Sequence, residues 1–146
     1  MIDYFIDMKR GYVILDHPAD MGIEAYGKNL KEAFEEAAIA LNSIILDLTT
    51  VEPIQHRKIE IKASDYEHLL VKWLSEILYL YDGDNFVCCE FDIEDLNPNF
   101  LKAEVKGEIF NNQKHQTKLD VKAVTYHQIL VCENSERGLV RVFLDI

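Results

Sequence analysis

The chain has 146 residues, and 26 Asp and Glu against 15 Lys and Arg give it a formal net charge of −11. A length near 150 predicts one domain, 1–146, that buries a core without disulfide or metal staples. The acidic balance argues against autonomous binding of RNA or DNA, because phosphate contacts from basic residues supply most of that affinity. It favours a cation or a basic protein as partner, with a simply solvated acidic surface as the alternative.

The sequence carries no recognisable signal for export, membrane insertion or disulfide formation. Its first ten residues lack the apolar run of a signal peptide, and no segment approaches the roughly 20 apolar residues of a transmembrane helix. The cysteines, Cys88, Cys89 and Cys132, are odd in number and lack zinc-site spacing. We therefore expect them to pack as small hydrophobic residues in a reducing, cytoplasmic setting.

The first part of the chain predicts two strands followed by a helix. Residues 12–15 and 22–28 are the expected strands. Asn29 offers an N-cap, and Glu32 three residues later completes a capping-box pair. Apolar residues then recur at spacings of three and four over residues 30–45, which predicts an amphipathic helix.

The rest of the chain predicts one more helix among several strands. A strand at 57–63 leads to a helix that Ser64 or Asp65 caps and Gly83 ends. The apolar stripe of this helix includes Trp73, which we expect in the core. The remaining strands are predicted at 86–91, 101–106, 121–125, 129–132 and 139–144, with a polar loop at 111–117. Because helices and strands do not alternate regularly, we expect an α+β fold with two helices on one face of a mainly antiparallel sheet.

Two internal segments carry polar groups that simple packing does not require. Asp16, His17 and Asp20 lie at a strand-to-loop transition, where functional groups are often held, although Asp and Pro also favour ordinary turns. A strand over 120–127 has two faces, Asp120, Lys122, Val124 and Tyr126 on one and Val121, Ala123, Thr125 and His127 on the other. This strand either lines a cleft or simply shows one face to water.

The chain end is the third candidate segment. A strongly apolar last strand brings Asp145 and the terminal carboxylate of Ile146 against the domain, which places two negative charges close together. Clustered hard oxygen donors are what Ca²⁺ or Mg²⁺ require, and Asp20 would add a third donor. A frayed, solvated tail is the alternative.

Other catalytic motifs are missing from the sequence. The six glycines are scattered, so no phosphate-binding loop is formed, and no nucleophile elbow or zinc motif occurs. We expect His56, His68 and His115 to be surface groups. The sequence therefore does not predict a self-sufficient enzyme.

From about Gly11 to Ile146 the sequence resembles the archease family. The motifs that carry the resemblance are, in chain order, Asp16-His17-Pro18-Ala19-Asp20-Met21-Gly22, Ala25-Tyr26-Gly27, Glu32-Ala33-Phe34, the run from Trp73 to Leu80, Lys122-Ala123-Val124-Thr125-Tyr126-His127, and Asp145-Ile146. Their order and spacing make the combination specific. The chain departs from the family at Pro18, where threonine is more common, and residues 1–7 resemble an N-terminal extension.

The resemblance implies a fold, a function and a set of site residues. The fold is a strand-helix-strand-strand module with an inserted segment. The function is that of a non-enzymatic accessory protein that promotes guanylylation and multiple turnover of the GTP-dependent tRNA-splicing RNA ligase. RNA is then contacted only through the ligase, and no membrane is involved. A divalent cation, calcium in the family with Mg²⁺ or Mn²⁺ as alternatives, is implied at Asp20, Asp145 and Ile146. Lys122 matches a residue linked to ligase activation, and His17 and His127 match recurrent residues.

Two other functional classes are compatible with the sequence. One is a general chaperone or assembly factor for RNA- or DNA-processing enzymes. The other is a metal-dependent RNA-processing enzyme that uses His17 and His127 as acid and base.

Overall fold

The computed structural model describes residues 9–16 and 20–146, so the predicted extension at 1–7 lies outside the described residues. The elements are β1 (Gly11–Asp16), β2 (Asp20–Gly27), α1 (Leu30–Ile45), the short 3-10 helix η2 (Leu48–Thr50), β3 (Gln55–Lys62), α2 (Tyr66–Asp84), β4 (Phe86–Asn97), β5 (Phe100–Ile109), β6 (Ala123–Glu133) and β7 (Gly138–Asp145).

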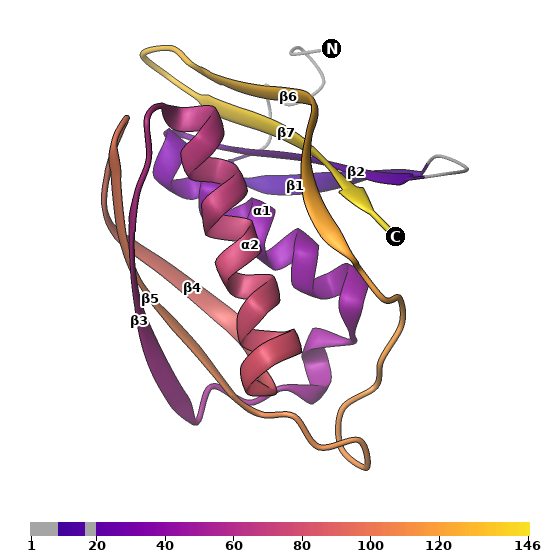
Figure 1. Ribbon diagram of the computed structural model, residues 1–146. Helices are drawn as coiled ribbons and strands as arrows, with labels where there is room; N and C mark the ends of the chain where they lie inside the picture. The colour runs from indigo at the N-terminus through magenta and orange to yellow at the C-terminus, as the bar shows by residue number, and fades with distance from the viewer. Residues whose placement is uncertain (1–8, 17–19) are drawn as a thin grey trace.

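The strands form two antiparallel sheets that each turn one face toward the helices. One sheet has the strand order β1-β2-β7-β6 and the other has the order β3-β5-β4. Figure 1 shows the helices in the middle, with the four-stranded sheet above them and the three-stranded sheet at the lower left. One core cluster includes residues of both helices and both sheets. The α+β class is therefore confirmed, although the strands form two sheets where one was expected.

Helix α1 begins as its sequence predicts. The Asn29 side chain accepts a hydrogen bond from the Glu32 backbone N–H at 3.0 Å. The Glu32 side chain accepts one from the Lys28 backbone N–H at 3.1 Å, one residue before the cap. The helix packs against α2 through Trp73, which is fully buried and donates its indole N–H to the Phe34 carbonyl oxygen at 3.0 Å. The expected place of Trp73 in the core is confirmed.

Helix α2 begins at the predicted cap but ends later than predicted. The Asp65 side chain accepts a hydrogen bond from the His68 backbone N–H at 2.8 Å. The helix continues through Gly83 and stops at Asn85, which has a φ of 53°. Asn85 therefore supplies the left-handed residue that glycine was expected to supply. Gly83 lies inside the helix, where a Cβ atom would come within 2.7 Å of the exposed Tyr79 ring unless that ring shifted.

The two strands predicted at 121–125 and 129–132 are one irregular strand, β6. Thr125 pairs with Phe143 of β7, but the next regular pair joins Leu130 to Arg141. Three more residues of β6 than of β7 lie between these pairs, and Gln128 within them has a φ of 49°. The strand begins only at Ala123, so Val121 packs into the main core rather than following the predicted alternation.

Two of the three cysteines lie as the sequence predicts. Cys88 is buried in the core and Cys89 is half-buried, as expected, whereas Cys132 is exposed on the sheet surface. All three are free thiols.

Over residues 9–16 and 20–146, neither helix combines the length and the apolar character that a membrane span requires.

Candidate functional site

The candidate site is built on the pairing of β2 with β7. The two strands run antiparallel over their full lengths, and Asp20 is directly opposite Asp145. Directly opposed residues point to the same face of a sheet, with their Cβ atoms about 4.5–5.5 Å apart. Two carboxylates from distant parts of the sequence are thereby placed side by side at the end of the sheet.

The face on which these carboxylates lie follows from burial along β7. Val140, Val142 and Leu144 are fully buried against the helices, so Phe143 and Asp145 belong to the opposite, outer face. Phe143 lies over Gly22, where a Cβ atom would come within 2.8 Å of the ring. Further along the outer face, the buried Glu24 forms an ion pair with Arg141 at 3.9 Å.

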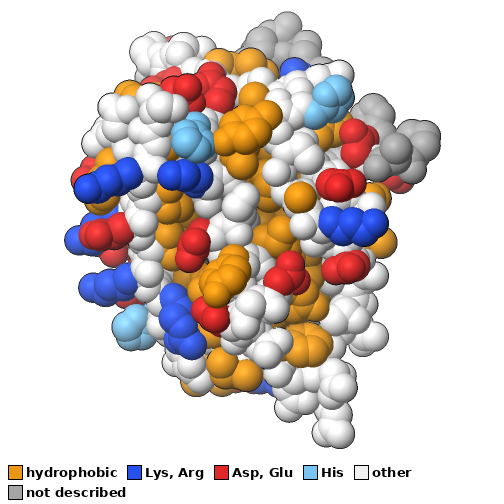
Figure 2. Space-filling model, in the orientation of Figure 1, with side chains coloured by type: hydrophobic (Ala, Val, Ile, Leu, Met, Phe, Trp, Pro, Cys, Tyr) orange, Lys and Arg blue, Asp and Glu red, His pale blue; other side chains and the backbone are white. Residues whose placement is uncertain are grey.

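The chain end and Lys122 adjoin the same position. Ile146 is half-buried and packs against the main core, which holds the last residue on the domain. The Lys122 backbone N–H donates to the Asp145 carbonyl oxygen at 2.8 Å, and Ala123 pairs with Asp145 in the sheet. Figure 2 shows red and blue side chains together at the right of this view, near where Figure 1 places the C-terminus.

Only one of the two candidate histidines lies among the described residues. His127 is exposed, its ring centroid lies 5.7 Å from that of Phe143, and its backbone N–H donates to the Thr125 hydroxyl at 3.3 Å. His127 therefore lies beside the aromatic residue that separates the acidic pair from the rest of the outer face. His17 lies outside the described residues.

The donors at this end of the sheet suit a hard divalent cation. Among the described residues, no three His, Cys, Asp or Glu side chains gather as a metal-binding group. The predicted set is of another kind, with two side-chain carboxylates and the terminal carboxylate of Ile146. All are oxygen donors, as Ca²⁺ and Mg²⁺ prefer. Like charges directly opposite each other destabilise a strand pair, and a bound cation would remove that cost.

A second polar cluster, at the end of β5, was not predicted. The His115 side chain is fully buried, which contradicts its expected surface position, and its Nε2 lies 2.9 Å from Glu108 Oε2. The Asn111 backbone N–H donates to His115 Nδ1 at 2.9 Å, so Nε2 carries the proton and donates to the carboxylate. Lys114 Nζ also donates to Glu108 at 2.9 Å. Lys114 and His115 belong to the polar loop, whereas Glu108 lies on β5, so the sequence pattern gave no sign of this cluster.

The hydrogen bonds to Glu108 determine its protonation. Burial raises the pKa of Glu108, but hydrogen bonds from His115, the Glu52 backbone N–H and Lys114 outweigh it and lower the pKa to about 2. The carboxylate is therefore ionised at neutral pH. The cluster fastens the 111–117 loop to β5 and has the character of a structural anchor.

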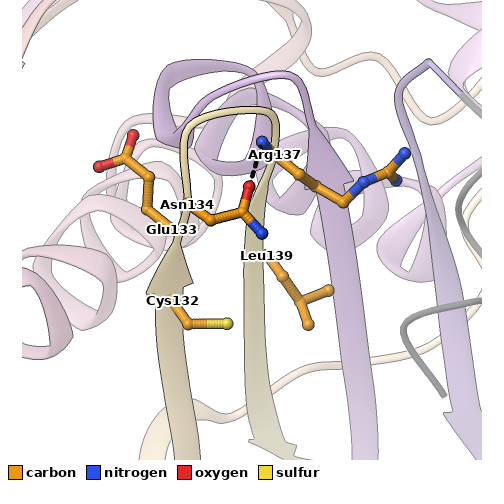
Figure 3. A pocket seen from close by; sticks show the side chains of 5 residues that line it. All are labelled: Cys132, Glu133, Asn134, Arg137 and Leu139. Atoms are coloured by element: carbon orange, nitrogen blue, oxygen red, sulfur yellow. Dashed lines mark hydrogen bonds between the residues drawn. The ribbon is translucent and has the colours of Figure 1, made fainter.

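A small hollow lies under the turn between β6 and β7, at the end of β7 remote from Asp145. It has a volume of about 130 Å³ and is lined by Cys132, Glu133, Asn134, Arg137 and Leu139 (Figure 3). The Asn134 side chain accepts hydrogen bonds from the backbone N–H groups of Glu136 and Arg137, both at 2.9 Å. Such Asx-type bonds shape a turn, so the hollow follows from the hairpin and is separate from the acidic pair.

Comparison with known proteins connects this arrangement to a family. The model of the archease protein family matches residues 12–146. The chain belongs to the archease family. Archease of Sulfolobus acidocaldarius is 40% identical over 136 residues, which cover 92% of this chain and 98% of that protein. Archease of Methanosarcina barkeri is 35% identical over 139 residues, covering 92% and 95%.

Solved structures agree with this family assignment. The solution structure of protein 1598 of Methanobacterium thermoautotrophicum is 32% identical with a TM-score of 0.78, covering 93% of this chain and 99% of that one. The crystal structure of the Thermotoga maritima archease, described as a possible chaperone, is 17% identical with a TM-score of 0.63. It covers 90% of this chain and 94% of its own, and it supports the fold alone.

Proposed function

We propose that this archease family member is a metal-binding accessory protein that activates the GTP-dependent tRNA-splicing RNA ligase, without catalytic activity of its own. The observation that carries the proposal is the register of β2 and β7, which sets Asp20 directly opposite Asp145. The family membership, the half-buried Ile146 and the hydrogen bond from Lys122 to Asp145 support it.

The proposal assigns two roles, cation binding and contact with the ligase, to different residues. Asp20, Asp145 and the terminal carboxylate of Ile146 hold a divalent cation, which neutralises their mutual repulsion and supplies a positive charge at the end of the sheet. Lys122 is exposed and its backbone N–H donates to the Asp145 carbonyl oxygen, which supports a role in which its ammonium group contacts the ligase near the bound cation. Cations at such an interface favour the binding of phosphate groups, as nucleotidyl transfer to the ligase requires.

The test compares Asp145→Asn with the wild-type chain in ligation assays with the purified ligase, GTP and RNA ends. Asparagine keeps the shape of the side chain and removes its charge. We expect loss of saturable Ca²⁺ binding by calorimetry and a drop of ligation to single turnover. Glu136→Gln, an equal charge change in the exposed turn at the far end of β7, is the control. Unchanged multiple turnover by Asp145→Asn would refute the proposal.

Lys122→Gln separates activation from metal binding. We expect this variant to bind Ca²⁺ as the wild type does and yet to promote less guanylylation of the ligase. The general chaperone alternative predicts no saturable cation binding that Asp20→Asn removes. The enzyme alternative predicts that the protein alone converts RNA in the presence of a divalent metal, whereas the accessory function predicts no product.

A further inference from the structure

The three-stranded sheet has two edges, and they differ in how they are covered. At the β4 edge, the Ile93 backbone N–H donates to the Glu35 side chain at 2.8 Å. Lys31 Nζ donates to the Glu94 carbonyl oxygen of the same edge at 3.4 Å. Helix α1 thus occupies hydrogen-bonding groups that a further strand would need. The β3 edge is different. Strand β3 pairs with β5 over eight residues without a register shift, so its other side is a regular edge.

The alternation of hydrogen bonds shows which groups of β3 face outward. The Ala63 backbone N–H donates to Asn99 across the β5 side at 3.1 Å. Antiparallel strands bond through alternate residues, so the odd-numbered residues of β3 bond to β5. The N–H and C=O groups of Lys58 and Glu60 therefore point away from the sheet.

The ends of this edge are occupied and its middle is not. The Lys62 carbonyl oxygen accepts from Lys72 Nζ of α2 at 2.8 Å, and the His56 carbonyl oxygen accepts from Arg57 Nη1 at 3.1 Å. In the part of the chain that the structure describes, no hydrogen bond beyond the sheet ladder involves the outward backbone groups of Lys58 or Glu60.

Space for another strand lies beside this edge. A groove of about 470 Å³ separates the end of β3 from helix α2. Its lining includes Glu60, Ile61 and Lys62 from the strand and Glu76 and Tyr79 from the helix. Tyr79 is 58% exposed and leaves apolar ring surface uncovered beside the strand. Figure 2 shows blue side chains along the left margin, where β3 runs in Figure 1.

We propose that this edge is a homodimer interface, in which β3 pairs antiparallel with β3 of a second copy so that Lys58 faces Glu60 of that copy. Their outward backbone groups then bond to each other, and Ile59 lies on the twofold axis. The side chains of Lys58 and Glu60 lie on the outer face of the sheet, because the intervening Ile59 is buried. Each dimer contains two such Lys–Glu pairs.

The charges select this register over its neighbours. Moving the partner strand by two residues places Lys58 against a second Lys58, or Glu60 against a second Glu60, and opposed like charges destabilise a sheet. Within each copy, Lys58 is already opposite Glu104 of β5, and Glu60 is opposite Lys102. The proposed pairing therefore continues an alternating row of charges from one copy into the next.

A twofold interface also explains why an open edge is tolerated. Unprotected edge strands are a route to aggregation. A self-complementary pairing uses the edge of both copies and closes after two, so that no open β3 edge remains for a third molecule. Helix α1 already covers part of the β4 edge.

The test uses charge reversal, with oligomeric state measured by light scattering after size exclusion over a range of concentrations. We expect a wild-type dimer that weakens with salt. Lys58→Glu alone and Glu60→Lys alone each create two like-charge pairs and weaken the dimer by at least about tenfold. Mixing the two variants restores opposite charges at both positions, and we expect a heterodimer from the mixture.

A backbone variant tests the hydrogen-bonding part independently. Glu60→Pro removes an N–H that points outward and leaves the ladder to β5 intact, as proline allows at an edge, so we expect a folded monomer. Circular dichroism checks its fold. A wild-type chain that is monomeric at every concentration would overturn the proposal, and the lysines would then only guard the edge. Dimers that persist in both single charge variants, or a mixture that does not reassociate, would also overturn it.

Discussion

Replacing Glu108 by Gln is a direct test of the buried cluster beneath the 111–117 loop. The carboxylate accepts hydrogen bonds from His115 at 2.9 Å, from the Glu52 backbone N–H at 2.8 Å and from Lys114 at 2.9 Å. Glutamine has nearly the same shape, but its amide NH₂ must face one of these three donors. Both His115 and the Glu52 N–H donate to Oε2, whereas Lys114 donates to Oε1. The amide oxygen of glutamine can replace Oε2, so the NH₂ group faces the Lys114 ammonium group and the charge-assisted bonds to the carboxylate are lost.

The structure sets the size of the loss and its pH dependence. The pKa of Glu108 falls from its ordinary value of 4.5 to about 2, because the hydrogen bonds to the ionised form outweigh burial. A tenfold change in proton affinity is worth about 1.4 kcal/mol, so ionisation contributes at most about 3.5 kcal/mol to the free energy of unfolding. Because the folded pKa is the lower one, this contribution is complete above about pH 5 and is lost as the pH falls toward 2.

The measurement is urea unfolding followed by Trp73 fluorescence, for the wild type and Glu108→Gln, at several pH values between 7 and 3. We expect the variant to be about 2–3 kcal/mol less stable at pH 7, with a difference that shrinks below about pH 4.5. Glu136→Gln, which changes an exposed carboxylate, controls for net charge. A difference below about 0.5 kcal/mol at pH 7, or one that is equal at pH 7 and pH 3, would refute the reasoning.

Two further predictions follow from the backbone and the thiols. Asn85→Ala should lower the free energy of unfolding by about 1 kcal/mol, because alanine disfavours the left-handed conformation at φ 53°. Asn85→Gly should be nearly neutral in the same urea titration, and equal losses would contradict this account. Burial raises the pKa of Cys88 to about 12 and that of Cys89 to about 11, whereas Cys132 is exposed. At pH 8 one thiol should therefore react fast with Ellman's reagent, and Cys132→Ser should abolish that phase.

Local signals in the sequence predicted most of the secondary structure. Asn29 and Glu32 predicted the start of α1 because capping is a contact between neighbours. The end of α2 was predicted too early, because Gly83 is the usual residue for a helix end. Here Gly83 stays within the helix, and Asn85 ends it. The division into two sheets was not predicted, since it depends on which strands pair, and strand pairing is not local.

The geometry of the candidate site likewise depends on strand pairing, which local sequence signals do not predict. The acidic residues were singled out from the sequence, but their juxtaposition depends on the register of β2 and β7. A slip of one residue would turn Asp145 toward the core face, and cation binding itself stays a prediction. His115 was misplaced because a histidine in a polar loop normally faces water. Its buried partner Glu108 lies on a strand whose alternation gave no sign of this contact.

The two sheets are built from different stretches of the chain, and this affects the order in which they fold. The three-stranded sheet and α2 come from the continuous stretch 55–109, so their contacts close short loops. The four-stranded sheet needs the last strand to return to the second one, across nearly the whole chain. Contacts between distant residues form slowly, because the entropy of closing the long loop must be overcome first. During synthesis Asp20 therefore cannot pair with Asp145 until β7 has been made. The pair of carboxylates consequently forms late, when the rest of the chain is already available for folding.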